Sequence, residues 1–208
     1  MSSGAFARTG SARYTSGVDP RIEALLRVPE IRDRRLGLVG LLSKELAARG
    51  LPPPVIVGGH AVEIYTFGAY ATQDVDLLCA DTKAFGEACA SLGLARRGRH
   101  WLQPEIPLAV ELGANEFPDR INEILVDGAP VRIISLEDLV IDRLNAYVWW
   151  KSTQDGDWAE MLLRLHRPHL DMAYLEKRAT EEDVLAALRE VLARPESSAT
   201  EGAANGGS

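Results

Sequence analysis

Two aspartates, Asp74 and Asp76, stand two residues apart at the start of an apolar segment that continues as Leu77-Leu78-Cys79. The segment has the pattern of a β-strand, in which residues two apart project from the same face with Cα atoms roughly 7 Å apart. At that spacing both carboxylates can share one divalent cation or hold a pair of cations. Asp74 and Asp76 are therefore candidate metal ligands, with strand-end carboxylates paired with surface arginines as the alternative.

A third carboxylate is predicted at Glu111, within Leu108–Leu112, where apolar residues alternate and Glu111 points away from the apolar face. Three carboxylates on one sheet face repel one another unless a cation neutralises them. Two Mg²⁺ ions about 4 Å apart activate an attacking hydroxyl and stabilise a leaving pyrophosphate. We therefore predict Asp74, Asp76 and Glu111 as catalytic metal ligands, with a salt-bridge role as the alternative for Glu111.

The glycines Gly58 and Gly59 follow the apolar run Val55–Val57 and precede a helix expected from about His60 to Phe67. An apolar run that stops on two glycines indicates a buried strand turning into a helix. Backbone N–H groups at a helix N-terminus bind phosphate oxygens, and glycine gives them unhindered access. Together with the aspartates, this predicts transfer of a nucleotide; tight packing is the alternative role of the glycines.

Further elements follow from periodicity and capping signals. The pattern predicts helices over 21–27, before Gly50, after Asp81, after Ser135, over 155–166, over 171–178 and after Thr180, an edge strand over 94–102, and a hairpin turning at Asp127-Gly128. This order predicts an α/β (α+β) fold, in which helices flank a small mixed β-sheet and a C-terminal helical segment follows. The expected division is a disordered tail (1–20), a core (21–134), a helical segment packed on the core (135–194) and a second disordered tail (195–208).

Composition narrows the class of protein. The 208 residues, 46% of them hydrophobic, are enough for one core, and the net charge of −7 argues against nonspecific coating of nucleic acid. Apolar runs fall far short of the ~20 residues that a membrane span needs, and no secretory signal is apparent, so cytoplasmic residence is expected. The basic run from Arg96 to Trp101 is a candidate RNA contact, but a solvated edge strand is the favoured interpretation.

Two motifs carry a resemblance to a known family. The segment Gly58-Gly59-His60-Ala61-Val62, followed by Thr72-Gln73-Asp74-Val75-Asp76-Leu77-Leu78, resembles the signature of the nucleotidyltransferase-fold superfamily, in which Gly-Gly or Gly-Ser precedes an Asp-x-Asp. The segment from Ile134 to Asp155 is similar to a helix of bacterial nucleotidyltransferase-like proteins related to abortive-infection toxins. The resemblance covers about residues 55–165.

The resemblance implies roles for individual residues. Asp74 and Asp76 would be metal ligands, and the implied nucleotide-binding set is Gly58, Gly59, His60, Thr72, Arg143 and Asp155. The chain departs from the family at Tyr70, where an arginine is common, and at Glu111, where an aspartate is usual.

The function implied is metal-dependent transfer of a nucleoside monophosphate from an NTP to a hydroxyl of RNA, tRNA or a protein, with two Mg²⁺ ions. A toxin–antitoxin or phage-defence system, with a cognate partner protein, is the implied context. One alternative is a catalytically inactive fold that binds nucleotide or protein, which Tyr70 and Glu111 favour. Another is an enzyme that modifies a small molecule such as an antibiotic.

Overall fold

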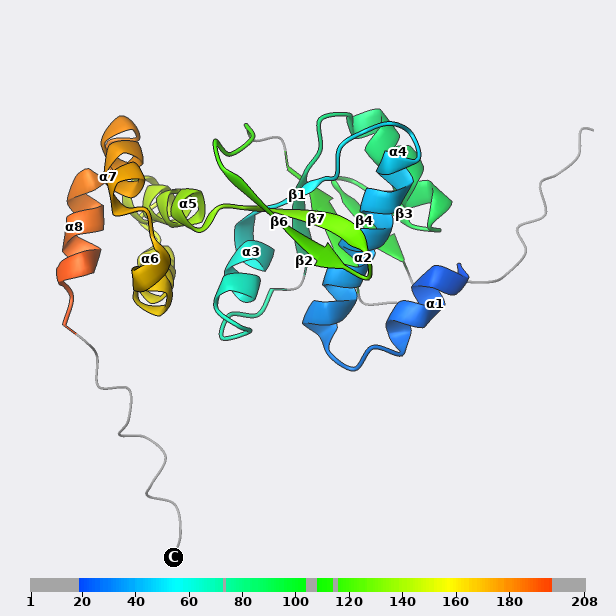
Figure 1. Ribbon diagram of the computed structural model, residues 1–208, viewed down its shortest axis with the longest axis horizontal. Coiled ribbons are helices and arrows are strands. Elements are labelled where there is room, and N and C mark those ends of the chain that lie inside the picture. The colour runs from blue at the N-terminus through cyan, green and yellow to red at the C-terminus, as the bar shows by residue number, and fades with distance from the viewer. Residues whose placement is uncertain (1–18, 73, 104–107, 114–115, 196–208) are drawn as a thin grey trace, which may run out of the picture.

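The structure is a computed structural model that describes residues 19–72, 74–103, 108–113 and 116–195 (Figure 1). Its helices are α1 (Pro20–Leu26), α2 (Ile31–Ala47), α3 (Gly58–Tyr65), α4 (Thr82–Ser91), α5 (Leu136–Trp149), α6 (Thr153–His166), α7 (Met172–Glu181) and α8 (Leu185–Ala193), with a 3₁₀ turn η1 (Arg167–His169). Its strands are β1 (Val55–Ile56), β2 (Asp74–Leu78), β3 (Ala95–Arg97), β4 (His100–Gln103), β5 (Leu108–Leu112), β6 (Ile121–Val126) and β7 (Ala129–Ile134).

The strands form one mixed sheet in the order β3-β4-β5-β2-β1-β7-β6. Strand β2 runs parallel to β5 and antiparallel to β1, and β1 runs parallel to β7. The remaining neighbours, β3 with β4, β4 with β5 and β6 with β7, are antiparallel. With its flanking helices and C-terminal helical segment, this architecture confirms the predicted α/β (α+β) class.

Local signals explain several elements. The Ser135 side chain accepts a hydrogen bond from the Asp138 N–H at the start of α5, and Asp81 accepts one from the Ala84 N–H at the start of α4. The β6–β7 hairpin turns at Asp127 and Gly128, both with positive φ, as a two-residue hairpin loop with right-handed strand twist requires. Each of these was predicted from the sequence.

Three element predictions were wrong. The last helix does not begin at Thr180, which lies within α7, but at Leu185. Helix α3 begins at Gly58 and ends at Tyr65, because the glycines form its first turn instead of a separate turn before it. The single edge strand expected over 94–102 is a hairpin, β3 and β4, because the chain reverses at Gly98 with a φ of 64°. The reversal makes β3 the sheet edge and places β4 between β3 and β5.

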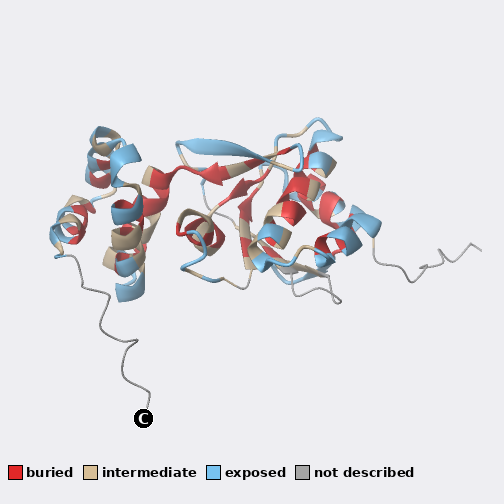
Figure 2. Cartoon of the chain, turned by 60° about the horizontal axis from the view of Figure 1, so that its bottom comes forward, coloured by how far each residue is buried: buried red, intermediate tan, exposed pale blue. Residues whose placement is uncertain are grey.

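One continuous hydrophobic core joins all eight helices to the sheet. Helix α2 packs on β7 and β6 and also contacts α1 and α4, whereas α3 packs on β2, α5 and α6. Figure 1 shows α5, α6, α7 and α8 grouped at one end of the molecule, and Figure 2 shows buried residues along the strands and on the helix faces turned toward them. The division at residues 134/135 stays a prediction, although it coincides with the step from β7 to α5.

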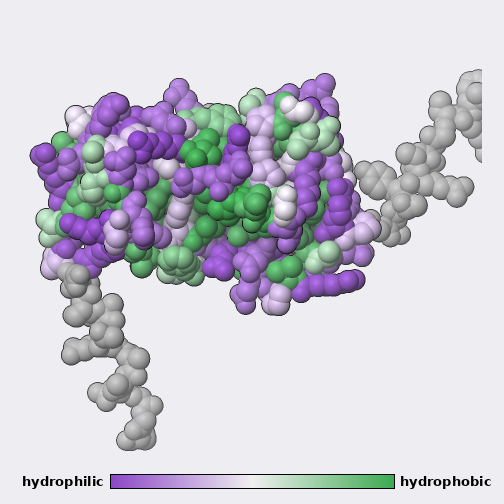
Figure 3. Space-filling view, in the orientation of Figure 1, coloured by the Kyte–Doolittle hydropathy of each residue, from purple (hydrophilic) through white to green (hydrophobic). Residues whose placement is uncertain are grey.

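The surface is mixed in character. Figure 3 shows hydrophobic residues gathered near the middle of one face, over the sheet, among hydrophilic ones. On the edge strand β6, Ile121, Ile124 and Leu125 are all exposed. Among the described residues, no helix is both long enough and apolar enough to cross a membrane.

Candidate active site

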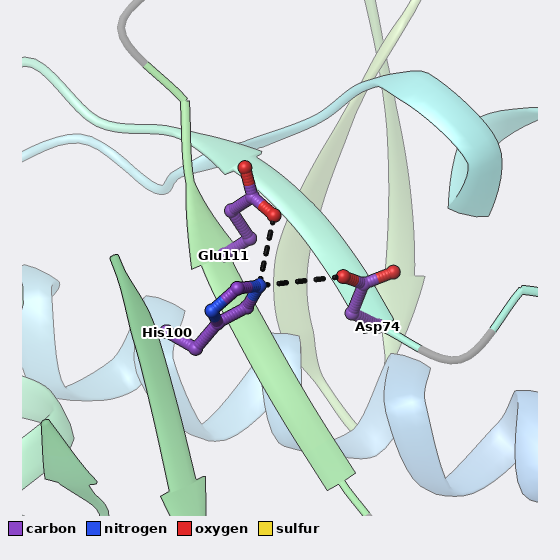
Figure 4. A group of neighbouring side chains, drawn as sticks. All are labelled: Asp74, His100 and Glu111. Atoms are coloured by element: carbon purple, nitrogen blue, oxygen red, sulfur yellow. Dashed lines mark ion pairs between the residues drawn. The ribbon is translucent and has the colours of Figure 1, made fainter. Parts of the chain in front are cut away.

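Three neighbouring strands bring a carboxylate pair and an imidazole together. In the sheet register Asp76 on β2 lies beside Glu111 on β5, and Glu111 lies beside His100 on β4. Asp74, two residues before Asp76, turns to the same face. Ligand atoms of Asp74, His100 and Glu111 all lie within 4.8 Å of one another, and Figure 4 shows the three side chains converging.

The cluster faces away from the core because each strand alternates. Val75 and Val110 are fully buried, so Asp74, Asp76 and Glu111 point to the other face of the sheet. The His100 Nε2 atom lies 3.0 Å from Glu111 Oε2 and 3.7 Å from Asp74 Oδ2. The second Glu111 oxygen, Oε1, lies 3.1 Å from Arg99 Nε. The described structure therefore pairs this carboxylate with two basic side chains.

Asp76 turns toward the start of α3. Its Oδ2 atom accepts a hydrogen bond from the Gly59 N–H at 3.1 Å. Burial, reinforced by the charges of Asp74 and Glu111, raises the pKa of Asp76 to about 6, although the Gly59 hydrogen bond and Arg143 act in the other direction. Gly58 makes the approach sterically feasible, because its φ is 58° and a Cβ atom there would overlap the Asp76 carboxylate.

The loop before β2 supplies two further side chains. The Thr72 hydroxyl donates a hydrogen bond to Asp74 Oδ1 at 3.2 Å. The Tyr70 hydroxyl lies over Gly59, where a Cβ atom would be 3.1 Å away, and the Tyr70 ring contacts Trp158 edge-on at 4.9 Å between ring centroids. Tyr70 thus fills space next to the predicted phosphate-binding turn with an uncharged group.

Arg143 and Asp155 pair with each other across α5 and α6. The Arg143 guanidinium donates to Asp155 Oδ1 at 2.7 Å and to Asp142 Oδ2 at 2.5 Å. Its charge acts to lower the pKa of both Asp76 and Tyr70. Asp155 is its ion-pair partner, and the roles of Arg143 and Asp155 in nucleotide binding stay predictions.

His60 does not reach the site with its side chain. It is fully buried, and its Nδ1 atom lies 3.1 Å from Glu63 Oε2. Burial lowers the pKa of His60, although Glu63 opposes the shift, so the imidazole is neutral at neutral pH. The His60 side chain is therefore an interior hydrogen-bonding group, and a role of His60 in nucleotide binding stays a prediction.

Two buried residues that were not predicted from the sequence, Arg35 and Glu63, stabilise the loop before β2. Arg35 on α2 donates to Glu63 Oε2 at 2.8 Å and also to the Thr72 carbonyl oxygen. Both Arg35 and Glu63 are buried. The only sequence signal for the burial of Arg35 is its position next to the leucine-rich face of α2. This buried network ties α2 and α3 to the residue that contacts Asp74.

His100 was also missed as a site residue. The sequence placed it in a basic run that ended in a tryptophan available for stacking on a base. Instead, the Trp101 ring packs against Gly86 and against Phe85, with ring centroids 6.4 Å apart, toward the core side of β4. Alternation along the strand then directs His100 to the opposite face, beside Glu111.

The donor set fits a divalent cation. Carboxylate oxygens are the ligands that Mg²⁺, Mn²⁺ and Ca²⁺ prefer, and imidazole nitrogen binds transition ions. Asp74 and Glu111 lie close enough to share one ion, since their ligand atoms are within 4.8 Å. Asp76 lies next to them but uses one oxygen at Gly59. The roles of these residues as metal ligands and catalysts stay predictions.

Comparison with known proteins finds one matching family and two similar solved structures. Residues 41–194 match the sequence model of a family described as "Nucleotidyltransferase of unknown function (DUF6036)". A crystal structure of an antigenic nucleotidyltransferase-like protein from Paracoccidioides brasiliensis is similar, with a TM-score of 0.49, 15% identity, and coverage of 73% of this chain and 90% of that one. A solution structure of the antibiotic-resistance factor ANT(2'')-Ia has a TM-score of 0.46, 20% identity, and coverage of 75% and 97%. No curated protein matches the chain with significance.

Proposed function

The chain belongs to this family of nucleotidyltransferases, and from that premise we propose that it transfers a nucleoside monophosphate from an NTP to a hydroxyl acceptor in a reaction that depends on a divalent cation. The observation that supports the proposal most directly is the convergence of Asp74 and Glu111, from parallel strands, on one point of the sheet face. Carboxylates placed in this way can hold the divalent cation on which such a transfer depends.

In the proposed reaction each side chain has a distinct task. Asp74 and Glu111 hold the cation, and Thr72 fixes one oxygen of Asp74 so that the other faces Glu111 and His100. Asp76 completes the acidic face and orients the first turn of α3 through Gly59. When bound, Mg²⁺ or a similar ion lowers the pKa of the attacking hydroxyl and neutralises charge on the departing pyrophosphate.

The triphosphate is proposed to lie at the first turn of α3, where Gly58 and Gly59 expose backbone without side chains. Arg143 is the cation that we propose for the triphosphate, because its charge acts to lower the pKa of both Asp76 and Tyr70. It replaces the arginine that the family commonly has at the position of Tyr70. Because Asp142 and Asp155 hold Arg143 in the described structure, nucleotide binding would exchange at least one of these partners for a phosphate.

We propose RNA, tRNA or a protein hydroxyl as the acceptor, in a toxin–antitoxin or phage-defence setting, on the strength of the sequence resemblance. The rival function is a catalytically inactive module that binds nucleotide. Two arrangements favour this rival function. Glu111 pairs with Arg99 and His100, and Arg143 pairs with two carboxylates. In both, side chains of the protein itself neutralise the charges that a cation or a phosphate would otherwise neutralise.

The test is incorporation of label from each of the four α-³²P-labelled NTPs, with Mg²⁺ or Mn²⁺, into total cellular RNA and protein. The wild-type protein is expected to label one acceptor class with one preferred NTP. The variants Asp74→Asn and Glu111→Gln are expected to lower the rate by at least about 100-fold, because removal of a ligand removes the cation's charge stabilisation.

The matched control is Asp157→Asn, which changes an exposed aspartate of α6 outside the cluster and is expected to leave labelling unchanged. Equal background labelling by the wild type and by Asp74→Asn, with every NTP and both acceptors, would reject the transferase. Retained NTP binding in that case, measured by calorimetry, would support the inactive nucleotide-binding module.

A further inference from the structure

We propose that His100 is a third protein ligand of the cation at Asp74 and Glu111, and that its nitrogen makes the site prefer first-row transition ions such as Co²⁺ and Zn²⁺ over Mg²⁺. The inference rests on the proposed function only in assuming that a cation binds at these two carboxylates. It concerns the identity of the ion and the residue that selects it.

The distances between donor atoms match those around a single ion. Ligands about 2.1 Å from a metal stand about 3.0 Å apart on the edge of an octahedron and about 3.4 Å apart in a tetrahedron. His100 Nε2 lies 3.0 Å from Glu111 Oε2 and 3.7 Å from Asp74 Oδ2, so all three atoms can face one ion with small side-chain rotations. Figure 4 shows the imidazole Nε2 edge directed between the two carboxylates.

The backbone holds His100 in this position. Strand β4 is hydrogen-bonded to β5 with His100 opposite Glu111, and Trp101 on the other face is wedged against Gly86 of α4. Glycine at position 86 allows this close packing, because a Cβ atom there would approach the Trp101 ring to 3.0 Å and displace it slightly. The side chain of His100 is 33% exposed, so a cation from solvent can reach it.

Imidazole changes which ion the site prefers. An all-carboxylate site suits Mg²⁺, which keeps several waters and gains little from nitrogen, whereas imidazole suits borderline transition ions. For a given site, affinity rises along the series from Mn²⁺ through Co²⁺ to Cu²⁺, and a nitrogen ligand contributes to that rise. One His and two carboxylates therefore favour a transition ion over Mg²⁺.

A different role for His100 predicts the opposite result. If His100 and Arg99 serve only as counter-charges for Glu111, they compete with any cation for the carboxylate. Removing His100 would then raise the affinity for every cation, including Mg²⁺. If His100 is a ligand, its removal lowers the affinity for Co²⁺ and leaves that for Mg²⁺ nearly unchanged.

The test measures Co²⁺ and Mg²⁺ binding to the full chain by calorimetry, and the visible absorption of bound Co²⁺, for the wild type and for His100→Gln. We expect the wild type to bind Co²⁺ at least about tenfold more tightly than Mg²⁺. His100→Gln is expected to weaken Co²⁺ binding by about tenfold or more and to shift its absorption bands, with less than about a threefold change for Mg²⁺. No catalytic turnover enters the measurement.

Two further variants make the result specific. His169→Gln removes an exposed histidine of η1 outside the cluster and is expected to keep wild-type Co²⁺ binding and spectrum. Asp74→Asn is expected to weaken both ions. Equal Co²⁺ affinity and unchanged bands in His100→Gln, or tighter binding of both ions, would overturn the ligand role of His100 without affecting the proposed transferase. Unchanged Co²⁺ binding in Asp74→Asn would also overturn the ligand role of His100, because the ion would then bind elsewhere. The proposed transferase is tested separately, by the NTP-labelling assay.

Discussion

Gly58 and Asp76 depend on each other at the scale of single residues. Gly58 has a φ of 58°, which side chains with a Cβ atom adopt at a cost, and its missing side chain leaves space that the Asp76 carboxylate occupies. Asp76 can then accept the Gly59 N–H and remain on the acidic face. The Gly-Gly signature therefore has a packing reason as well as its proposed role in phosphate binding.

Gly58→Ala is expected to lower the free energy of unfolding by about 2–4 kcal/mol, combining the strain of positive φ with overlap against Asp76. Gly50→Ala is the matched control, because Gly50 also has positive φ, 72°, but nothing lies within 4 Å of its added Cβ. The control should lose only about 1–2 kcal/mol. Urea unfolding measures both, and equal losses would contradict the close contact at position 58.

Asp76 carries a charge that destabilises the fold when no cation is present. Its pKa of about 6 in the folded chain exceeds the ordinary value of 3.8, so the folded state binds the proton more tightly than the unfolded state. The resulting stabilisation is fully present below about pH 3.8 and is lost as the pH rises through about 6. Above that pH the ionised carboxylate, next to Asp74 and Glu111, lowers stability.

Asp76→Asn is therefore expected to be more stable than the wild type at pH 8 in the presence of EDTA, with the difference shrinking toward zero near pH 4. The Asn oxygen can still accept the Gly59 N–H. Thermal unfolding at the two pH values measures the effect. Asp33→Asn, at an exposed position of α2, should change stability by less than about 0.5 kcal/mol at either pH. A wild type more stable than Asp76→Asn at pH 8 would contradict the prediction.

The sequence identified some site residues and missed others for a physical reason. Asp74 and Asp76 were found because two positions on one strand share a face, which is a local property. His100 was missed because its proximity to Glu111 depends on the β4–β5 register and on the reversal at Gly98, neither of which local periodicity specifies. The burial of His60 was missed because its partner Glu63 and the cation Arg35 meet only in the folded chain.

At the scale of elements, the loop before β2 is held by a buried ion pair between two helices. Arg35 of α2 and Glu63 of α3 are 5% and 4% exposed, and Arg35 also binds the Thr72 carbonyl oxygen. Burial raises the pKa of Glu63, but His60 and Arg35 outweigh it and hold that pKa below its usual value. Glu63 is thus a buried carboxylate whose charge is compensated by its neighbours.

Glu63→Gln is expected to destabilise the protein by about 3–5 kcal/mol, because Arg35 would stay buried without a counter-charge. The double variant Arg35→Met/Glu63→Met removes both charges and should be closer to the wild type in urea unfolding than Glu63→Gln is. Cation binding should nevertheless weaken in the double variant, because the Thr72 carbonyl loses its anchor. Strictly additive effects of the two single Met substitutions would exclude a coupled pair.

Element types were predictable where the deciding interactions lie within a few residues. The Asp127-Gly128 hairpin and the Ser135 cap depend on backbone conformation and one local hydrogen bond, and both were predicted. Trp149 and Trp150 are large apolar residues next to the apolar stripe of α5, yet they are 56% and 83% exposed. Trp149 is the last residue of α5 and Trp150 is its C-cap, and periodicity does not show which parts of a helix its neighbours cover.

At the scale of the whole molecule, the sheet and the C-terminal helices share one hydrophobic core. Leu139 and Leu144 of α5 and Leu162 of α6 are fully buried in the same cluster as Val75 and Val110 of the sheet. A polar contact crosses the junction as well, since the Asp138 carboxylate of α5 accepts from the Arg120 N–H next to β6. The candidate site draws on both parts, with Asp74 on β2 of the sheet and Arg143 on α5 of the helical segment.

Because the core is continuous, we expect both parts to unfold in one cooperative transition. Trp101 reports on the sheet and Trp158 on the helices, so each can be observed alone after the exposed Trp149 and Trp150 are replaced by Phe. Further replacement of Trp158 or of Trp101 by Phe gives two proteins that each keep a single tryptophan. For each protein, unfolding followed by fluorescence is compared with unfolding of the same protein followed by circular dichroism. This comparison controls for the change in stability that the substitutions cause.

In each single-tryptophan protein, the urea midpoint from fluorescence should coincide with the midpoint from circular dichroism. A helical segment that unfolded before the sheet would give Trp158 a midpoint below that of the circular dichroism, and Trp101 a midpoint above it. That result would mean that the junction holding Arg143 beside Asp76 opens while the sheet stays folded. Coincident midpoints would mean that the carboxylate cluster and the proposed phosphate-binding arginine are lost together, because the same buried contacts hold both.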